Sequence, residues 1–124
     1  MKKYIALLFA GLLILGLACT TTASREVTIE LTNPHDTIPV AFDGHYQIND
    51  EPEEAMTGET PAEYTFELEE GDEVDGMVYK SDSTNFTDTL HFQVLFDGVE
   101  QSNLAADIII PTELGGITFS FAVQ

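Results

Sequence analysis

The sequence contains very little positive charge. Four Lys and Arg residues stand against 22 Asp and Glu residues, which gives a formal net charge of −18 at pH 7. The phosphates of DNA and RNA and anionic lipid headgroups repel such a protein, so the composition argues against nucleic-acid binding. Repulsion between carboxylates also destabilises the compact state at low salt, and screening over about 3 Å at molar salt removes most of that penalty. We therefore expect a halophilic protein, adapted to a salty habitat, and an acidic surface that serves only solubility is the alternative.

Tryptophan is absent and cysteine occurs once, at Cys19. One cysteine forms no intramolecular disulfide, so an exported domain must rely on its hydrophobic core. Carbohydrate-binding surfaces usually use exposed aromatic side chains, and beyond the first 18 residues the tyrosines are Tyr46, Tyr64 and Tyr79. The first two have the parity of core positions, whereas Tyr79 has the opposite parity to Val78 and is expected to face outward.

Residues 1–18 have the layout of a bacterial signal peptide. Lys2 and Lys3 give a short basic start, and an almost wholly apolar run follows. The run is shorter than the roughly 20 apolar residues that a membrane-spanning helix needs. We therefore expect these residues to direct export and to be removed.

The end of this leader resembles the lipobox of bacterial lipoproteins, because small residues precede Cys19 in Leu-Gly-Leu-Ala-Cys. In that family the cysteine receives lipid on its sulfur and becomes the mature N-terminus. The resemblance implies an exported protein, anchored to a membrane in the periplasm or on the cell surface, with residues 19–24 as lipidated cysteine and tether. Gly16 stands where the lipobox usually has Leu, which leaves cleavage by ordinary signal peptidase after Ala18 or Ala23 as the alternative.

Residues 25–124 are expected to form one domain. A mature chain of about 106 residues is long enough for a two-layer core. Apolar and polar residues alternate with period two through most of it, as in the segments 27–31 and 117–123. Seven or eight such segments at short, regular spacing predict an all-β, antiparallel, immunoglobulin-like β-sandwich. Only residues 104–107 and 111–114 have a pattern that suits a helical turn.

Two Asp-Gly pairs call for different interpretations. A tight hairpin at Asp43-Gly44 would place Tyr46 on the opposite face from Phe42. A continuous strand keeps the apolar even-numbered residues between 38 and 48 on one face, so we expect Gly44 to be a bulge or a point of close approach.

Turn and loop signals separate the other strands. At residues 97–98 a hairpin is expected, because it pairs Phe96 with Val99. Polar, acidic residues over 49–61 and polar residues over 81–87 predict two loops.

Two acidic clusters are the candidate metal sites. The first contains Asp50, Glu51, Glu53 and Glu54, and the second contains Glu69, Glu70, Asp72, Glu73 and Asp75. Carboxylates on a loop suit Ca²⁺, which takes 6–8 oxygen ligands. No EF-hand spacing is present, so a hydrated acidic surface is the favoured interpretation and Ca²⁺ the alternative.

Recognisable catalytic motifs are missing from the sequence. His35 lies in a turn, and His45 and His91 are at odd-numbered positions that are expected to face solvent. Their spacing matches no metal-ligand motif, and no Gly-x-Ser-x-Gly nucleophile motif occurs. We therefore predict a non-enzymatic protein without a cofactor.

The segment from Val27 to Val123 resembles in layout the exported, immunoglobulin-like sandwich domains of the MmpS family of small mycobacterial membrane proteins. The residues that carry this similarity are Tyr64-Thr65-Phe66, Val78-Tyr79-Lys80 and the run from Phe92 to Val99. The resemblance implies a role as the partner of a membrane transporter.

A further resemblance is to PEGA modules, which are small surface β domains. It rests on Val40-Ala41-Phe42-Asp43-Gly44 followed by Gly58-Glu59-Thr60-Pro61. The expected function is a lipid-anchored module of the cell envelope that serves adhesion, scaffolding or a transporter. The alternative is an exported module that binds carbohydrate or depends on Ca²⁺.

Overall fold

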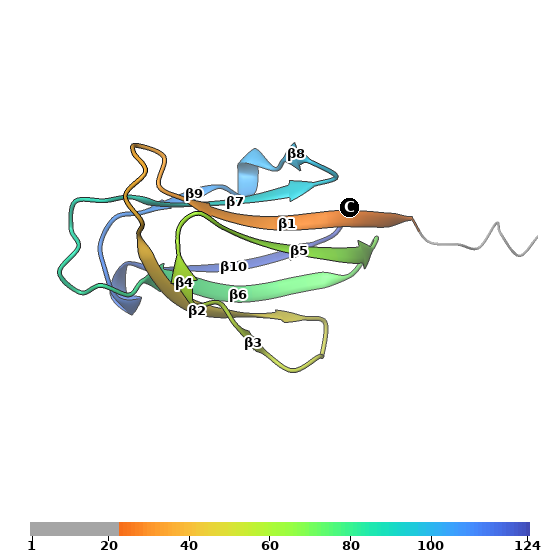
Figure 1. Ribbon diagram of the computed structural model, residues 1–124. Coiled ribbons are helices and arrows are strands. Elements are labelled where there is room, and N and C mark those ends of the chain that lie inside the picture. Colours follow the sequence, from red (N-terminus) through yellow and green to blue (C-terminus); the bar gives the residue numbers. More distant parts are fainter. Residues whose placement is uncertain (1–22) are drawn as a thin grey trace, which may run out of the picture.

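The computed structural model describes residues 23–124 (Figure 1), so the predicted signal peptide and Cys19 lie outside the described residues. The strands are β1 (Ser24–Thr32), β2 (Ala41–Ile48), β3 (Glu54–Ala55), β4 (Gly58–Glu59), β5 (Ala62–Glu69), β6 (Glu73–Lys80), β7 (Leu90–Phe96), β8 (Val99–Glu100), β9 (Ala106–Ile108) and β10 (Ile117–Ala122). Two 3₁₀ turns, η2 (Ser102–Leu104) and η3 (Glu113–Gly115), interrupt the last third of the chain. Within residues 23–124 no helix has the length and apolar character needed to cross a membrane.

The strands form two antiparallel sheets of five strands each. In the first sheet the order is β5-β1-β7-β8, and β9 also pairs with β7. In the second sheet the order is β10-β6-β2-β3, and β4 also pairs with β2. The two sheets lie one above the other in Figure 1. The predicted all-β, antiparallel, immunoglobulin-like sandwich is therefore confirmed.

The core lies between the sheets because the inward positions of the long strands are apolar. On β1, Val27, Ile29 and Leu31 have no exposed surface, and the residues between them face outward. Period-two alternation thus produces one buried face and one solvated face, as expected for a two-sheet sandwich.

Aromatic contacts show which strands face each other across the core. The rings of Phe92 on β7 and Phe119 on β10 have centroids 4.9 Å apart. The rings of Tyr46 on β2 and Phe66 on β5 have centroids 5.0 Å apart. Strand β7 therefore lies opposite β10, and β5 lies opposite β2.

Strand β2 runs without a break through Gly44, as predicted from the parity of its apolar residues. A Cβ atom on Gly44 would overlap the carbonyl oxygen of Met77 on β6. Glycine is required here because the two backbones approach closely, which confirms the second of the two roles considered for Gly44.

Ile38 does not join the buried face, and the prediction that placed it there is wrong. It lies before β2, and 56% of its surface is exposed. The Asp36 carboxylate accepts the Ile38 N–H at 2.8 Å, and the Asn33 side-chain amide donates to the Ile38 carbonyl at 3.1 Å. These local bonds keep the segment in a turn, because Asn and Asp side chains compete with strand pairing for backbone groups.

The segment 49–61 is more ordered than the predicted polar loop. Its short strands β3 and β4 fold back and pair with β2. Met56 between them is fully buried, and its N–H donates to the Gly44 carbonyl at 2.9 Å. One apolar side chain thus anchors an otherwise acidic segment against the second sheet.

The predicted helical turns occur close to their expected positions, but residues 106–108 form β9 instead of continuing a turn from Leu104. Ile108 is buried by pairing of β9 with β7, whereas Ile109 and Ile110 are exposed. Strand pairing wins here because it buries Ile108 in the core.

The sandwich has two distinct ends. The N-terminal end contains Ser24, the hairpin at residues 97–98 and Gln124, whose carbonyl accepts the Arg25 Nε–H at 2.9 Å. The distal end consists of three loops, which cover residues 33–40, 81–89 and 109–116. Figure 1 shows these loops at the left and the entry to β1 at the right.

Candidate binding surfaces

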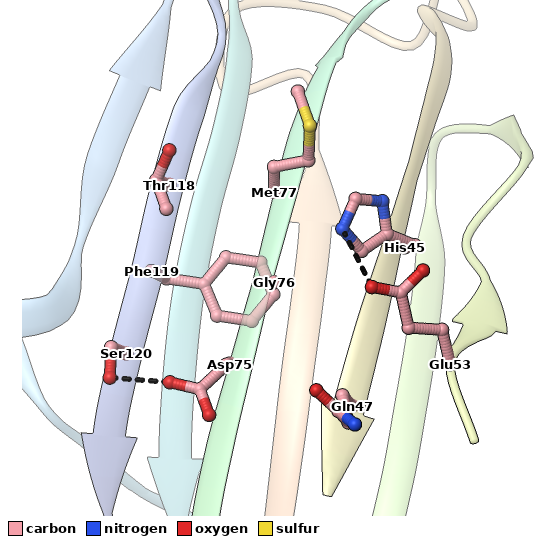
Figure 2. A pocket seen from close by; sticks show the side chains of 9 residues that line it. All are labelled: His45, Gln47, Glu53, Asp75, Gly76, Met77, Thr118, Phe119 and Ser120. Carbon is pink, nitrogen blue, oxygen red and sulfur yellow. Dashed lines mark hydrogen bonds and ion pairs between the residues drawn. The ribbon is translucent and has the colours of Figure 1, made fainter.

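A shallow hollow lies on the outer face of the second sheet (Figure 2) and has a volume of about 280 Å³. The residues that line it are His45, Gln47, Glu53, Asp75, Gly76, Met77, Thr118, Phe119 and Ser120. Strands β2, β6 and β10 supply most of them, and Glu53 lies just before β3. Gly76 leaves room for the Phe119 ring on the core side of the sheet, because a Cβ atom there would lie 2.5 Å from Cζ of that ring.

The polar groups of the hollow form two separate pairs. His45 Nε2 lies 3.6 Å from Glu53 Oε2, and the Ser120 hydroxyl donates to Asp75 Oδ1 at 2.5 Å. No hydrogen bond among residues 23–124 joins His45 to Ser120. A nucleophile needs a base within hydrogen-bond reach, so these residues supply a polar surface without the arrangement of a Ser-His nucleophile.

A second network lies on the same face, around Asp43. Its carboxylate accepts hydrogen bonds from the Thr57 hydroxyl at 2.8 Å, the Gly44 N–H at 2.8 Å and the Tyr79 hydroxyl at 3.3 Å. The Thr57 bond is the main cause that lowers the pKa of Asp43. Partial burial raises the pKa of Tyr79, and the neighbouring Asp43 charge adds to that effect. Tyr79 faces outward as predicted, but its hydroxyl is engaged by Asp43.

The Ca²⁺ candidates are dispersed in the structure. The first cluster lies between β2 and β3 or at the start of β3 and contains Asp50, Glu51, Glu53 and Glu54. The second lies at the start of β6 and contains Asp72, Glu73 and Asp75. Asp72 closes the turn before β6, since its carboxylate accepts the Glu69 N–H at 2.8 Å and the Asn49 side-chain amide at 3.1 Å. Within residues 23–124 no three His, Cys, Asp or Glu side chains converge in an arrangement that suits a metal ion.

His91 belongs to a polar row on the outer face of the first sheet. Its Nδ1 lies 2.6 Å from Asp107 Oδ1, and its Nε2 lies 3.3 Å from the Gln93 side-chain oxygen. The Gln93 amide in turn donates to Glu30 Oε1 at 2.5 Å. His45 and His91 both face outward as predicted, and each has a carboxylate partner that the spacing along the chain did not reveal.

Lys80 joins two loops of the distal end. Its side chain has no exposed surface, and its ammonium donates to the carbonyls of Asp88 at 2.5 Å and Ile109 at 2.7 Å. A buried ammonium needs such partners, because leaving them unmade costs free energy. The sequence already indicated this burial, because Lys80 has the same parity as Val74 and Val78 and so lies on the inward face of β6.

Exposed apolar side chains occur in all three loops of the distal end. They are Ile38, Phe86, Ile109, Ile110 and Leu114. Leu114 is 95% exposed and Phe86 is 63% exposed. A sixth large apolar side chain with high exposure, Val99, lies on β8 next to the hairpin at 97–98. Sequence reasoning missed this cluster, because only the fold brings three separate loops to one end.

No family model, curated protein or solved structure matches this chain. The class of protein is therefore defined by its fold, an all-β sandwich of two antiparallel sheets.

Proposed function

We propose that this chain is a non-enzymatic binding module of the cell envelope. It is exported, held to a membrane by lipid on Cys19, and binds a protein partner through its distal end as an adhesion, scaffold or transporter-accessory module. The observation that carries the proposal is that all three distal loops, away from the end where β1 begins, contain exposed apolar side chains, five in total.

The free energy available at this surface supports binding. Burying a Leu, Ile or Phe side chain stabilises a complex by about 1.5–3 kcal/mol. Several exposed large apolar side chains at one end of a soluble protein are consistent with an interaction site. A partner that covers Phe86, Ile110 and Leu114 would therefore gain a substantial part of the binding energy from three side chains.

Backbone strain occurs in the same loops. Thr112 has φ 68° and ψ 178°, a conformation that is largely restricted to glycine. Such a conformation costs about 1–3 kcal/mol and is found mostly at functional sites. The Thr112 N–H donates to the Lys80 carbonyl at 2.8 Å. This hydrogen bond connects the strained residue to the end of β6, where the Lys80 side chain is buried.

Charge indicates the chemistry of the partner. The distal loops also contain Asp36, Asp82, Asp88 and Glu113. A partner with apolar recesses surrounded by Lys and Arg would complement both the apolar side chains and the carboxylates. An anionic membrane surface would be repelled by the same carboxylates.

A site-specific photocrosslinker tests the distal surface in the intact cell. Placed at Leu114, it should give a discrete product with another protein. Placed at Glu67, which is exposed on the edge strand β5 near the start of β1 and lies away from both the distal end and β10, it should not. Equal products at both positions, or crosslinking at Leu114 to lipid alone, would contradict the proposal.

The anchor is tested separately by Cys19→Ser. The substitution should move the protein from the membrane fraction to the soluble fraction, because one or more acyl chains are lost. Mass spectrometry of the mature N-terminus should show a mass increase for acyl chains on Cys19. A variant that stays in the membrane fraction would refute the lipid anchor without bearing on the distal surface.

A further inference from the structure

The outer edge of β10 is unpaired among the described residues. Strand β10 is the last strand of the second sheet. Just beyond it, the Val123 N–H donates to the Asp72 carbonyl at 2.8 Å, and the Gly71 N–H donates to the Val123 carbonyl at 2.9 Å. Both backbone groups of Val123 therefore point toward the β6 side. Because this direction alternates along an antiparallel strand, every second residue of β10 points its N–H and C=O away from β6. These residues are Thr118, Ser120 and Ala122.

The other sheet edges are protected, and β10 is not. Edge strand β5 carries Glu63, Glu67 and Glu69, and charged side chains discourage edge-to-edge pairing. The strands β3, β4 and β8 have two residues each, and β9 has three. Strand β10 has six residues, Ile-Thr-Phe-Ser-Phe-Ala, without a charge or a proline. An unprotected edge of this length is a template for a further strand.

A groove lies beside this edge, with a volume of about 490 Å³. Its apolar lining consists of Phe121 and Ala122 on β10, Phe96 on β7 and Leu104 on η2. The polar residues Gln101, Asn103, Ser120 and Gln124 complete the lining. Because β7 lies opposite β10, the strands β8 and β9 of the first sheet extend beyond the edge of the second sheet. A strand added to β10 would lie below them, and its inward side chains would enter the groove.

We propose that β10 accepts an extended segment of a partner protein as an added β-strand. Main-chain hydrogen bonds give affinity in this mode of recognition, and alternate side chains in pockets give specificity. The inward side chains of the segment are apolar, to match Phe96, Leu104 and Phe121. This site is separate from the distal end and does not depend on the function proposed for it.

Charge identifies the outward side chains of the segment as Lys or Arg. Asp75 and Glu73 lie on the neighbouring strand β6, paired with Ser120 and Ala122 of β10. A second copy of this chain is a poor occupant, because it brings the same net charge of −18 and no cation on its own β10. In a partner segment that alternates apolar and basic residues, the apolar side chains match the groove. The basic side chains match the negative charge of the protein.

The probe is a synthetic peptide of about eight residues that alternates Val and Lys, which is a typical strand length. Two further versions carry N-methyl groups on the Val amides or on the Lys amides. In a strand only one of these two sets faces the neighbouring strand. We expect calorimetry to show a fall in affinity of about tenfold or more for one methylated peptide and little change for the other. Equal binding of all three peptides would show attraction by charge alone and would overturn the proposal, as would no binding at all.

A variant of β10 tests the acceptor edge. Ser120→Pro removes an outward N–H while leaving the bonds to β6, since proline is tolerated where the N–H faces solvent at an edge. It should weaken binding of the unmodified peptide by about tenfold or more. Ser120→Ala, which keeps the N–H and loses only the bond to Asp75, should bind like the parent. Equal binding by both folded variants would contradict the proposal.

Two measurements remain informative if Ser120→Pro does not fold. Amide hydrogen exchange at Thr118, Ser120 and Ala122 of the parent protein should slow when the peptide is added, and unchanged exchange would contradict the proposal. Sedimentation of the parent without peptide should show a monomer. A dimer that protects the same three amides would assign the edge to a second copy and overturn the assignment to a partner protein.

Discussion

Gly44 and Met77 show how one missing side chain positions two strands. A Cβ atom on Gly44 would meet the Met77 carbonyl, which belongs to the backbone of β6 and cannot move aside cheaply. Gly44→Ala should therefore lower the free energy of unfolding by about 1–3 kcal/mol, the usual cost of overpacking. The matched control is Gly58→Ala, because the added atom there would lie 3.5 Å from Cζ of Phe42, an ordinary contact. Urea denaturation measures both, and similar losses for the two variants would contradict this interpretation.

Lys80 gives a prediction with a defined dependence on pH. Burial lowers the pKa of Lys80 below its ordinary value of 10.5. Between the lowered pKa and 10.5 the unfolded chain binds a proton that the folded chain has released, so the free energy of unfolding rises with pH across that window. Lys80→Met removes this contribution together with the bonds to Asp88 and Ile109. The substitution should lower the free energy of unfolding by about 1–3 kcal/mol near neutral pH.

The pH test compares the parent protein with Lys80→Met. The difference in free energy of unfolding between them should widen as the pH rises through the lowered pKa of Lys80 toward 10.5. Burial raises the pKa values of Tyr46 and Tyr64, so these groups reduce stability at alkaline pH, but they do so in both proteins. A difference that stays constant across this range would show that the buried ammonium does not titrate differently on unfolding.

At the scale of the strands, like charges lie opposite each other on the solvent face of β1 and β5. Glu30 is paired with Glu63, and Glu26 is paired with Glu67. Directly opposed like charges destabilise a sheet, and opposite charges contribute roughly 0.2–1 kcal/mol. Glu63→Lys should therefore raise the free energy of unfolding at low salt by about that amount. The gain should shrink in molar salt, and Glu63→Gln should give an intermediate gain; a Lys variant no more stable than the Gln variant would contradict the argument.

Most of the long strands could be predicted because alternation is a local signal. The stretches around Val27, Leu68 and Phe121 each show their buried face in the sequence. The continuous path through Gly44 was also predictable, because only one path kept Phe42 and Tyr46 on the same face. The hairpin at Asp97 followed from the apolar pair that it brings together, Phe96 and Val99.

The remaining features depend on contacts that are distant along the chain. The strands β3 and β4 have two residues each, too short to show alternation, and Met56 between them looks like an isolated apolar residue in an acidic loop. The distal surface depends on the fold, which brings the loops that contain Phe86 and Leu114 to the same end. The free edge of β10 depends on strand order. Neither property is encoded within one segment, so sequence patterns alone did not predict either surface.

The whole molecule is dominated by its charge. In residues 23–124 the cations are Arg25 and Lys80, against 22 acidic residues, and Lys80 is buried. Screening acts over about 10 Å at 0.1 M salt and about 3 Å at 1 M, so self-repulsion should fall steeply across this range. We expect the melting temperature to rise with NaCl, by about 4–8 °C for each kcal/mol gained.

The control for this salt effect is a variant with fewer opposed carboxylates. Glutamine at the four positions Glu26, Glu30, Glu63 and Glu67 removes the repulsion between β1 and β5 while keeping the size of the side chains. Its melting temperature should rise less with NaCl than that of the parent protein. Circular dichroism at increasing salt measures both, and an unchanged melting temperature of the parent would refute the expected adaptation to salt.

The Arg25–Gln124 hydrogen bond determines where a tag fused after Gln124 would lie. Because Arg25, near the start of β1, contacts Gln124, a segment attached after Gln124 would leave the sandwich beside the start of β1. The nine residues of β1 span about 30 Å, so the distal loops lie about that far from both Ser24 and Gln124. A fluorescent label or affinity tag after Gln124 would therefore leave the apolar loops unobstructed. The same tag inserted in the loop at 81–89 would cover them.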